Sequence, residues 1–189
     1  MNLSYVYDSF KKISNILRYK ETKELSKIVD VNSSSDKVNY LDKESNKLIV
    51  NSLSNYHNIV GYVSEEDSNM VFFNDKISNL KDSDKKYLLL FDPLDGSKNV
   101  EVNVTVGTIY SLIEYDLNDK KIKKIVEAGY CLYGPCCILV KTNGNNVESY
   151  HLNNKNEFIL VNEKIDNIKK NKLYCINQSK TFELEIKKI

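Results

Sequence analysis

The sequence predicts an α+β fold in layers, of the α/β/α type, with two N-terminal helices followed by a mostly antiparallel sheet. Three observations predict this class. Apolar residues recur at helical spacing near the N-terminus, runs typical of strands come later, and neither an internal repeat nor a linker divides the chain. A chain of 189 residues is long enough for one substantial core. One domain with a single core is therefore expected.

The two expected helices lie on either side of a polar segment. The first begins at Leu3, extends toward Val29 and is broken before Thr22, since its apolar residues are three or four apart. The segment Asp30–Asp36 has the composition of a turn and is expected to be a flexible loop. The second helix follows this loop and carries Asp42 on an amphipathic pattern.

Short apolar or alternating runs predict the strands. Strands are expected at Ile59–Val63, Tyr87–Phe91, Val102–Val106, Thr108–Tyr115, Ile138–Thr142, Val147–Leu152 and Glu157–Val161. Turns are expected at Asn118–Asp119 and at the hairpin signal Asn143–Gly144. The polar segment Ser68–Lys86 is expected to be an excursion between two strands. Pro93 is expected to stop strand pairing, because proline has no N–H group.

The composition favours no macromolecular partner. The chain has 27 basic and 26 acidic residues, so charge indicates neither nucleic acid nor a membrane surface. No signal peptide or membrane-spanning run is present, which predicts a soluble, cytoplasmic protein. The four cysteines contain no C-x-x-C pair and are expected to be reduced thiols used as small apolar residues, so a zinc site is not expected.

The most informative motif is the run Phe91-Asp-Pro-Leu-Asp-Gly-Ser-Lys-Asn-Val100, which follows an expected buried strand. Asp92, Asp95 and the carbonyl of Leu94 can converge on one hard cation, because such cations prefer oxygen ligands. Gly96 allows a close backbone approach. The N–H groups of Gly96, Ser97 and Lys98 would point at an anion if they open a turn or helix. A metal beside a phosphate-binding turn suggests phosphate chemistry.

Three acidic clusters stand at the ends of expected elements. They are Asp36 with Asp42, Glu65 with Glu66, and Asp92 with Asp95. Phosphate monoesters hydrolyse very slowly without a catalyst, and two carboxylate-held Mg²⁺ ions would need about four to six carboxylate ligands. The three clusters supply that number.

Several motifs in order make the chain resemble the fructose-1,6-bisphosphatase (class 1) family. The motifs are Asp36 with Leu41–Asp42 and Ser45–Asn46, Val63–Asp67, Asp92–Ser97 with Asn99, Val106–Tyr110, Ala128–Gly134, Glu157–Leu160 and Tyr174–Asn177. An ordered series is far more specific than any single motif. The resemblance implies that residues 1–178 form the N-terminal domain of this family, with a divergent tail at 179–189 and no C-terminal sugar-binding domain.

The resemblance also implies roles for individual residues. Metal ligands would be Asp36, Glu65, Asp92, the Leu94 carbonyl and Asp95. Glu66 would help activate the attacking water and Asp42 would orient it. Asp95, Gly96, Ser97 and Lys98 would bind the 1-phosphate. The implied reaction converts fructose 1,6-bisphosphate to fructose 6-phosphate, a gluconeogenic step, with two or three Mg²⁺ ions per site that Mn²⁺ or Zn²⁺ can replace.

Three departures from the family pattern qualify these expectations. Lys98 stands where a second serine is usual. Lys86 and Tyr87 match an AMP-binding pair, but Glu114 occupies the position of the arginine that completes the site, which makes AMP regulation doubtful. The chain is also shorter than family members at its C-terminus, so a truncated form is expected.

Two alternatives stay open at the level of sequence. Tyr133–Pro135 leans toward a sedoheptulose-1,7-bisphosphatase, whereas Glu157–Leu160 and Ala128–Tyr130 favour the six-carbon sugar. A chain without the second domain could instead be a non-catalytic module that binds metal or serves as an oligomer partner. The family suggests a homotetramer as the assembly of the complete protein, with a sugar bisphosphate as the partner molecule and neither nucleic acid nor membrane involved.

Overall fold

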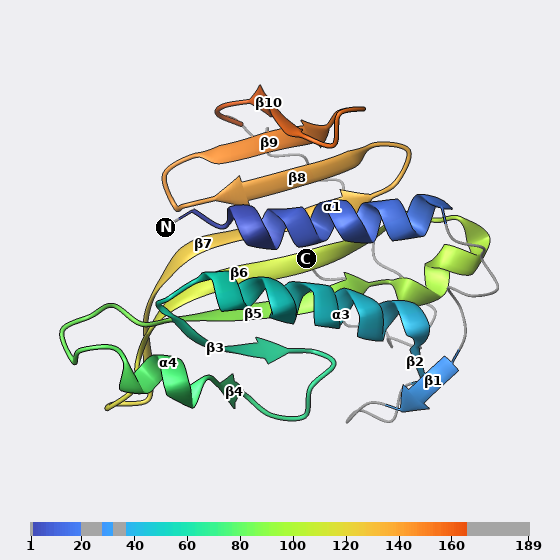
Figure 1. Cartoon of the computed structure of the whole chain (residues 1–189). Coiled ribbons are helices and arrows are strands. Elements are labelled where there is room, and N and C mark those ends of the chain that lie inside the picture. The colour runs from blue at the N-terminus through green and yellow to red at the C-terminus, as the bar shows by residue number, and fades with distance from the viewer. Residues whose placement is uncertain (1, 20–27, 32–36, 166–189) are drawn as a thin grey trace, which may run out of the picture.

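An eight-stranded sheet forms the centre of the molecule, and two long helices lie across it (Figure 1). The structure is a computed structural model that describes residues 2–19, 28–31 and 37–165, with backbone alone for 28–31 and 37–39. The expected divergent tail at 179–189 lies outside the described residues, as do Asp36 and Cys175.

The strands of this sheet are β3 (Ile59–Ser64), β4 (Val71–Phe72), β5 (Tyr87–Asp95), β6 (Val106–Asp116), β7 (Lys121–Tyr133), β8 (Cys137–Thr142), β9 (Val147–Leu152) and β10 (Phe158–Asn162). Their spatial order is β10-β9-β8-β7-β6-β5-β3-β4. Neighbouring strands run antiparallel except β3 and β5, which are parallel. The predicted α+β class and the mostly antiparallel sheet are confirmed.

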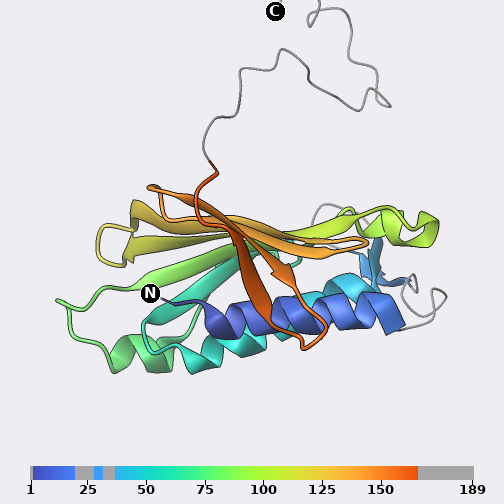
Figure 2. The ribbon, with the colours of Figure 1, turned by 90° about the horizontal axis from the view of Figure 1, so that it is seen from above.

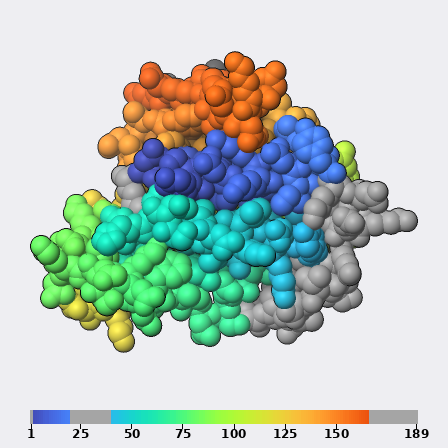
Figure 3. Space-filling view, in the orientation of Figure 1, coloured from blue at the N-terminus to red at the C-terminus, as the bar shows by residue number. Residues whose placement is uncertain are grey.

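Helices α1 (Ser4–Tyr19) and α3 (Tyr40–Ser52) lie on the same side of the sheet (Figure 2). The space-filling view shows them next to each other, α1 nearer β8 and α3 nearer β3 (Figure 3). Their buried side chains include Phe10, Ile13 and Ile49, which join the inward residues of β5 and β6 in one core. Both predicted helices are confirmed over these bounds, and burial of one apolar stripe explains why they form.

Three smaller elements and a hairpin complete the described chain. Strands β1 (Ile28–Val31) and β2 (Lys37–Asn39) pair as the hairpin. The three smaller elements are η1 (Leu53–Asn55), α4 (Asn74–Ser78) and η2 (Ser97–Val102). The first helix therefore does not extend to Val29, and Asp30–Val31 is strand rather than loop. On the other face of the sheet Val60, Leu88 and Ile113 form a small cluster that Ile77 and Leu80 cover. In the described part of the chain, no helix has the length and apolar character that a membrane span requires.

The sheet differs from the sequence prediction in two places, for identifiable reasons. One strand was not predicted, and one predicted strand is not formed. β7 was not expected, because residues 121–125 are exposed and largely charged, so its first half shows no apolar alternation. Pairing with β6 forms it instead. The alternation of Val102 and Val104 predicts a strand, yet β6 begins at Val106 and both side chains are exposed, to 69% and 54%. Val102 is the last residue of η2, and a 3-10 helix has three residues per turn, so it does not bury every second side chain.

Candidate active site

The acidic turn after β3 lies beside the end of β5, because these strands run parallel and finish at the same edge of the sheet. Ser64 pairs with Phe91 in register. The backbone N–H of Glu65 donates a 3.1 Å hydrogen bond to the Phe91 carbonyl. Glu65 and Glu66 therefore emerge next to Asp92, although about 25 residues separate them in sequence.

A bulge in β5 carries the two aspartates of the opening motif. Asp92 pairs with Ile109 and Asp95 pairs with Gly107, so Pro93 and Leu94 together oppose one residue of β6. Such an extra residue bends the strand and redirects its side chains. Pairing is interrupted at Pro93, as predicted, but it resumes at Asp95, because proline is tolerated where a bulge interrupts the hydrogen-bond ladder.

Hydrogen bonds from both sides hold this bulge. The N–H of Leu94 donates to Oδ1 of Asp92 at 3.0 Å, and the Leu94 side chain is buried. The hydroxyl of Thr108 donates to the Pro93 carbonyl at 2.8 Å and lies 2.7 Å from the hydroxyl of Tyr133. The sequence predicts a strand that contains Thr108, but no local motif reveals that Thr108 and Tyr133 support the bulge.

Helix α3 brings a further carboxylate to the same place. Asp42 lies in its first turn and is only 5% exposed. Asn46, one turn further along α3, accepts a 2.8 Å hydrogen bond from the Ser64 hydroxyl and donates to Asp67 at 3.3 Å. These bonds fix α3 against the acidic turn, and the negative charge of Asp42 acts on both Glu66 and Asp92.

The ionisation of Glu66 reflects this crowding. Burial raises its pKa to about 8, and a hydrogen bond with Glu65 and the charges of Asp42, Glu65 and Asp92 add to the increase. A carboxyl group so perturbed is typical of a functional site, since each nearby negative charge disfavours the next.

Asp92 shows the same effect to a smaller degree. Burial is the main cause that raises the pKa of Asp92 to about 6. The charges of Asp95, Glu65 and Asp42 act in the same direction, whereas the hydrogen bond from the Leu94 N–H lowers the pKa. Five predicted site carboxyl groups are thus close enough to interact: Asp42, Glu65, Glu66, Asp92 and Asp95.

This donor set fits a hard divalent cation, because oxygen ligands with mutually repelling charges are stabilised when a cation comes between them. Among the residues that the structure describes, no three His, Cys, Asp or Glu side chains already form a closed coordination group. The carboxylates are therefore neighbours rather than a preformed cage. Asp36, the further predicted ligand, lies outside the described residues.

The predicted phosphate-binding turn directly follows the bulge. Gly96 has a left-handed conformation, with φ of 79°, and precedes η2. Its carbonyl accepts a 2.7 Å hydrogen bond from the Asn99 N–H. Ser97 and Lys98 are the first two residues of this helical turn, so the condition under which these N–H groups would point at an anion is met. Their role in phosphate binding stays a prediction.

The two residues that match an AMP-binding pair, Lys86 and Tyr87, lie at the opposite end of β5 from Asp92. Lys86 donates hydrogen bonds to the carbonyls of Lys81 and Asp84, at 2.8 and 3.3 Å. Tyr87 is buried and pairs with Glu114 in register. Glu114 therefore places a carboxylate beside this pair.

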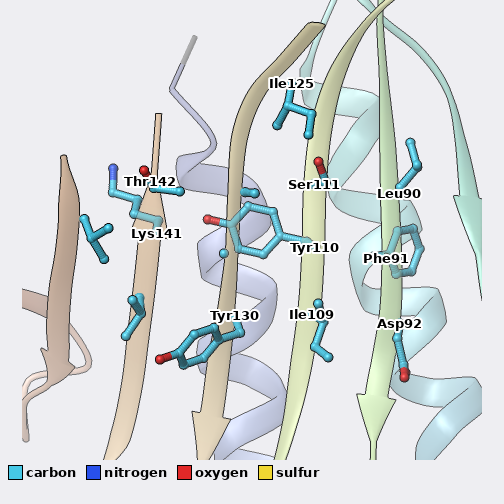
Figure 4. A pocket seen from close by; sticks show the side chains of 14 residues that line it. Leu90, Phe91, Asp92, Ile109, Tyr110, Ser111, Ile125, Tyr130, Lys141 and Thr142 are labelled. Atoms are coloured by element: carbon cyan, nitrogen blue, oxygen red, sulfur yellow. The ribbon is translucent and has the colours of Figure 1, made fainter. Parts of the chain in front are cut away.

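The face of the sheet opposite α1 and α3 is hollowed next to Asp92. The hollow has a volume of about 630 Å³, and its lining is mostly apolar. Figure 4 shows Leu90 and Asp92 from β5 with Ile109 from β6 and Tyr130 from β7 along it. Ile109, Ile125 and Tyr130 are 40–64% exposed. The acidic cluster thus stands at the end of an apolar surface.

Comparisons with known proteins show what the chain is similar to. The family model described as "Fructose-1-6-bisphosphatase, N-terminal domain" matches residues 1–163. A cytosolic fructose-1,6-bisphosphatase of Oryza sativa subsp. indica is 34% identical over 160 residues, which cover 79% of this chain and 45% of the relative. Isozyme 2 of Bos taurus is 32% identical, with coverage of 93% and 53%.

A solved structure matches the fold. The fructose-1,6-bisphosphatase of Leishmania major in holo form superposes with a TM-score of 0.78 at 29% identity, over 93% of this chain and 57% of that one. The chain thus spans about half the length of the relatives that it matches.

Proposed function

The chain belongs to the fructose-1,6-bisphosphatase family, and from this membership we propose that it acts as a Mg²⁺-dependent phosphatase. The substrate is fructose 1,6-bisphosphate, and hydrolysis of its 1-phosphate gives fructose 6-phosphate and phosphate. The observation that carries this proposal is the meeting of Glu65, Glu66 and Asp92 at one sheet edge, with the pKa of Glu66 raised to about 8. The corresponding cellular role is gluconeogenesis in the cytoplasm, by a homotetramer.

The carboxylates divide into metal ligands and groups that handle the water. Glu65, Asp92, Asp95 and the Leu94 carbonyl would hold the ions, together with Asp36. Bound Mg²⁺, or Mn²⁺ or Zn²⁺ in its place, neutralises phosphoryl charge, favours deprotonation of water and stabilises the leaving alkoxide.

Glu66 and Asp42 act on the attacking water. A general base works best when its pKa is near the operating pH. Burial and the neighbouring carboxylates raise the pKa of Glu66 to about 8 in the metal-free site, and a bound cation would lower it, which leaves Glu66 ionised to accept a proton. Asp42 is buried beside it and orients the water by accepting a hydrogen bond.

The turn after the bulge holds the phosphate. The N–H groups of Gly96, Ser97 and Lys98 donate to phosphate oxygens, and the Lys98 side chain adds a positive charge beside them. Replacement of Lys98 by Ser should raise KM for the bisphosphate by about tenfold with a smaller change in kcat, because one charged contact is worth about 1.4 kcal/mol or more.

The test is phosphate release from fructose 1,6-bisphosphate by the purified protein. Release is expected with Mg²⁺, and it should be lost with a chelator and in Asp95→Asn. Equal release by wild type and Asp95→Asn would contradict the proposal. Faster release from sedoheptulose 1,7-bisphosphate would support the seven-carbon sugar, which the names of the relatives do not favour. Mg²⁺ binding without release would identify the chain as a non-catalytic module.

A further inference from the structure

Cys131 and Cys137 lie in contact inside the core, one on β7 and one on β8. Their Sγ atoms are 3.6 Å apart, and both residues are free thiols that are fully buried. The sequence predicts reduced cysteines used as small apolar residues, which requires no such contact. Two thiols at this distance can form a bond if one of them is oxidised.

The two thiols differ in acidity. A hydrogen bond from Cys131 lowers the pKa of Cys137, and Ser14 and the positive charge of Arg18 contribute in the same direction, against the effect of burial. Burial raises the pKa of Cys131 well above its ordinary value. The thiolate, which is the reactive form, therefore belongs to Cys137, and Cys131 holds the proton.

A cavity lined in part by α1 lies near this pair. It has a volume of about 420 Å³, and its lining includes Ser14, Arg18, Tyr133, Gly134 and Pro135. Ser14 and Arg18 are the groups that act on Cys137 from α1. A small uncharged oxidant in this cavity reaches Ser14, which is hydrogen-bonded to Cys137.

A chain of hydrogen bonds connects the pair to the bulge that carries Asp92 and Asp95. The Pro93 carbonyl can only accept, so the single proton of the Thr108 hydroxyl is donated to it. The Tyr133 hydroxyl must then donate to Thr108, which leaves the Tyr133 oxygen to accept. The side chain bonded to Tyr133 on its other side is Cys131. The Cys131 sulfur is therefore in contact with Tyr133 on one side and with Cys137 on the other.

Oxidation would disturb this chain. A disulfide draws the Cys131 sulfur toward Cys137 and so changes its contact with Tyr133, which is buried. Tyr133 itself pairs with Cys137 in register, so the two cysteines are diagonal neighbours. Diagonal positions are further apart than the usual spacing of a disulfide, so bond formation must pull the ends of β7 and β8 together. Strained disulfides of this kind are readily reduced.

We propose that Cys131 and Cys137 are a reversible redox pair that a small peroxide oxidises to a disulfide, and that Tyr133 and Thr108 transmit this change to the Asp92–Asp95 bulge. The Cys137 thiolate attacks one oxygen of hydrogen peroxide and breaks the O–O bond, which gives a sulfenic acid and, after uptake of a proton, water. The Cys131 thiol then attacks the sulfenic sulfur, loses its proton and releases a second water. The two thiols lose two electrons, and the peroxide gains them.

The first experiment counts thiols after exposure of the purified protein to hydrogen peroxide. Of the four cysteines, two should be lost from wild type and recovered with a reductant, and peptide mapping should join Cys131 to Cys137. Cys136→Ser is the matched control, because Cys136 is an exposed neighbour. This variant should still form the bond at the wild-type rate.

Removal of Cys137 should stop the reaction. Cys137→Ser, or Cys137→Ala if the serine variant melts at a lower temperature, should lose thiols at least about tenfold more slowly than wild type. Cys131→Ala should stop at a sulfenic acid on Cys137, which a dimedone adduct would reveal. An unchanged rate in the Cys137 variants, or a disulfide that maps to Cys136, overturns the redox pair.

The second experiment tests transmission by hydrogen exchange. In oxidised wild type the amides of Leu94 and Asp95 should exchange at least about threefold faster than in the reduced protein. Tyr133→Phe should keep the disulfide and lose this difference. Equal exchange in both redox states of wild type, or an undiminished difference in Tyr133→Phe, overturns the transmission. Disulfide formation does not depend on phosphatase activity, so it can fail or succeed independently of the proposed function.

Discussion

The hydroxyl of Thr108 donates a 2.8 Å hydrogen bond to the carbonyl of Pro93, so β6 directly supports the bulge of β5. Thr108 is completely buried, and Tyr133 lies on its other side. A single side chain thus stabilises the backbone between the two aspartates of the proposed metal site.

Replacement of Thr108 by Val should weaken both stability and metal binding. The Pro93 carbonyl and the Tyr133 hydroxyl would lose a buried partner, which costs about 1–3 kcal/mol. Urea denaturation should show this loss, and calorimetry should show weaker Mg²⁺ binding. Thr142→Val is the control, because the Thr142 hydroxyl accepts from the exposed Gly144 N–H. Similar losses in both variants would argue against a specific role for Thr108.

Asp92→Asn and Asp95→Asn should each weaken Mg²⁺ binding by at least about tenfold, since each removes a charged ligand. Without metal, Asp92→Asn should melt at a higher temperature than wild type, because burial and neighbouring carboxylates raise the pKa of Asp92 to about 6. Calorimetric titration and thermal melting measure the two effects. Asp75→Asn, in an exposed helix turn, should change neither. Unchanged affinity in both site variants would exclude the proposed ligands.

The stability of the metal-free protein should fall as pH rises from about 4.5 to about 8. Burial raises the pKa of Glu66 from its ordinary value of 4.5 to about 8, so the folded state binds a proton in this window that the unfolded state has lost. The stabilisation is complete below the unfolded pKa and disappears above the folded one.

Melting temperatures across this pH range, with a chelator present, measure the effect. Glu66→Gln should flatten the profile, and Glu163→Gln, an exposed change, should leave it unaltered. Saturating Mg²⁺ should restore wild-type stability at pH 8. A profile for Glu66→Gln as steep as that of wild type would show that other groups cause the slope.

A buried carboxylate should anchor α1 to the sheet. Glu127 is 9% exposed and accepts hydrogen bonds from the hydroxyls of Tyr7 on α1 and Tyr110 on β6, the latter at 2.9 Å. Tyr7→Phe should therefore cost about 1–3 kcal/mol of unfolding free energy, because the carboxylate loses a charge-assisted bond. Denaturant unfolding measures this, and Tyr19→Phe, whose side chain is 82% exposed, is the control. Equal stability of the two variants would rule out the anchor.

Much of the fold could be predicted because local signals are strong in this chain. The apolar stripe of α1 and the short runs of β3, β8 and β9 appear in the sequence as they do in the structure. β7 could not be predicted, since residues 121–125 are exposed and charged and pairing with β6 forms the strand. The hairpin of β1 and β2 depends on pairing in the same way.

The candidate site could likewise be predicted only in part. The Asp92–Ser97 motif identified its residue types and its turn, and the ordered motifs indicated the family that the comparison with residues 1–163 confirms. No local motif indicates that strand pairing resumes after Pro93, that Thr108 holds the Pro93 carbonyl, or that Cys131 meets Cys137. Each of these is a contact between strands.

The sequence by itself determined the family, the order of most helices and strands, and the carboxylates available for a cation. Only the tertiary structure decided that Asp42, Glu66 and Asp92 meet, and that their mutual repulsion and burial raise the pKa of Glu66 and Asp92. The physical reason is that motifs and periodicity act over a few residues, whereas strand pairing and helix packing bring together groups about 25 to 50 residues apart, and these distances set the electrostatics of the site.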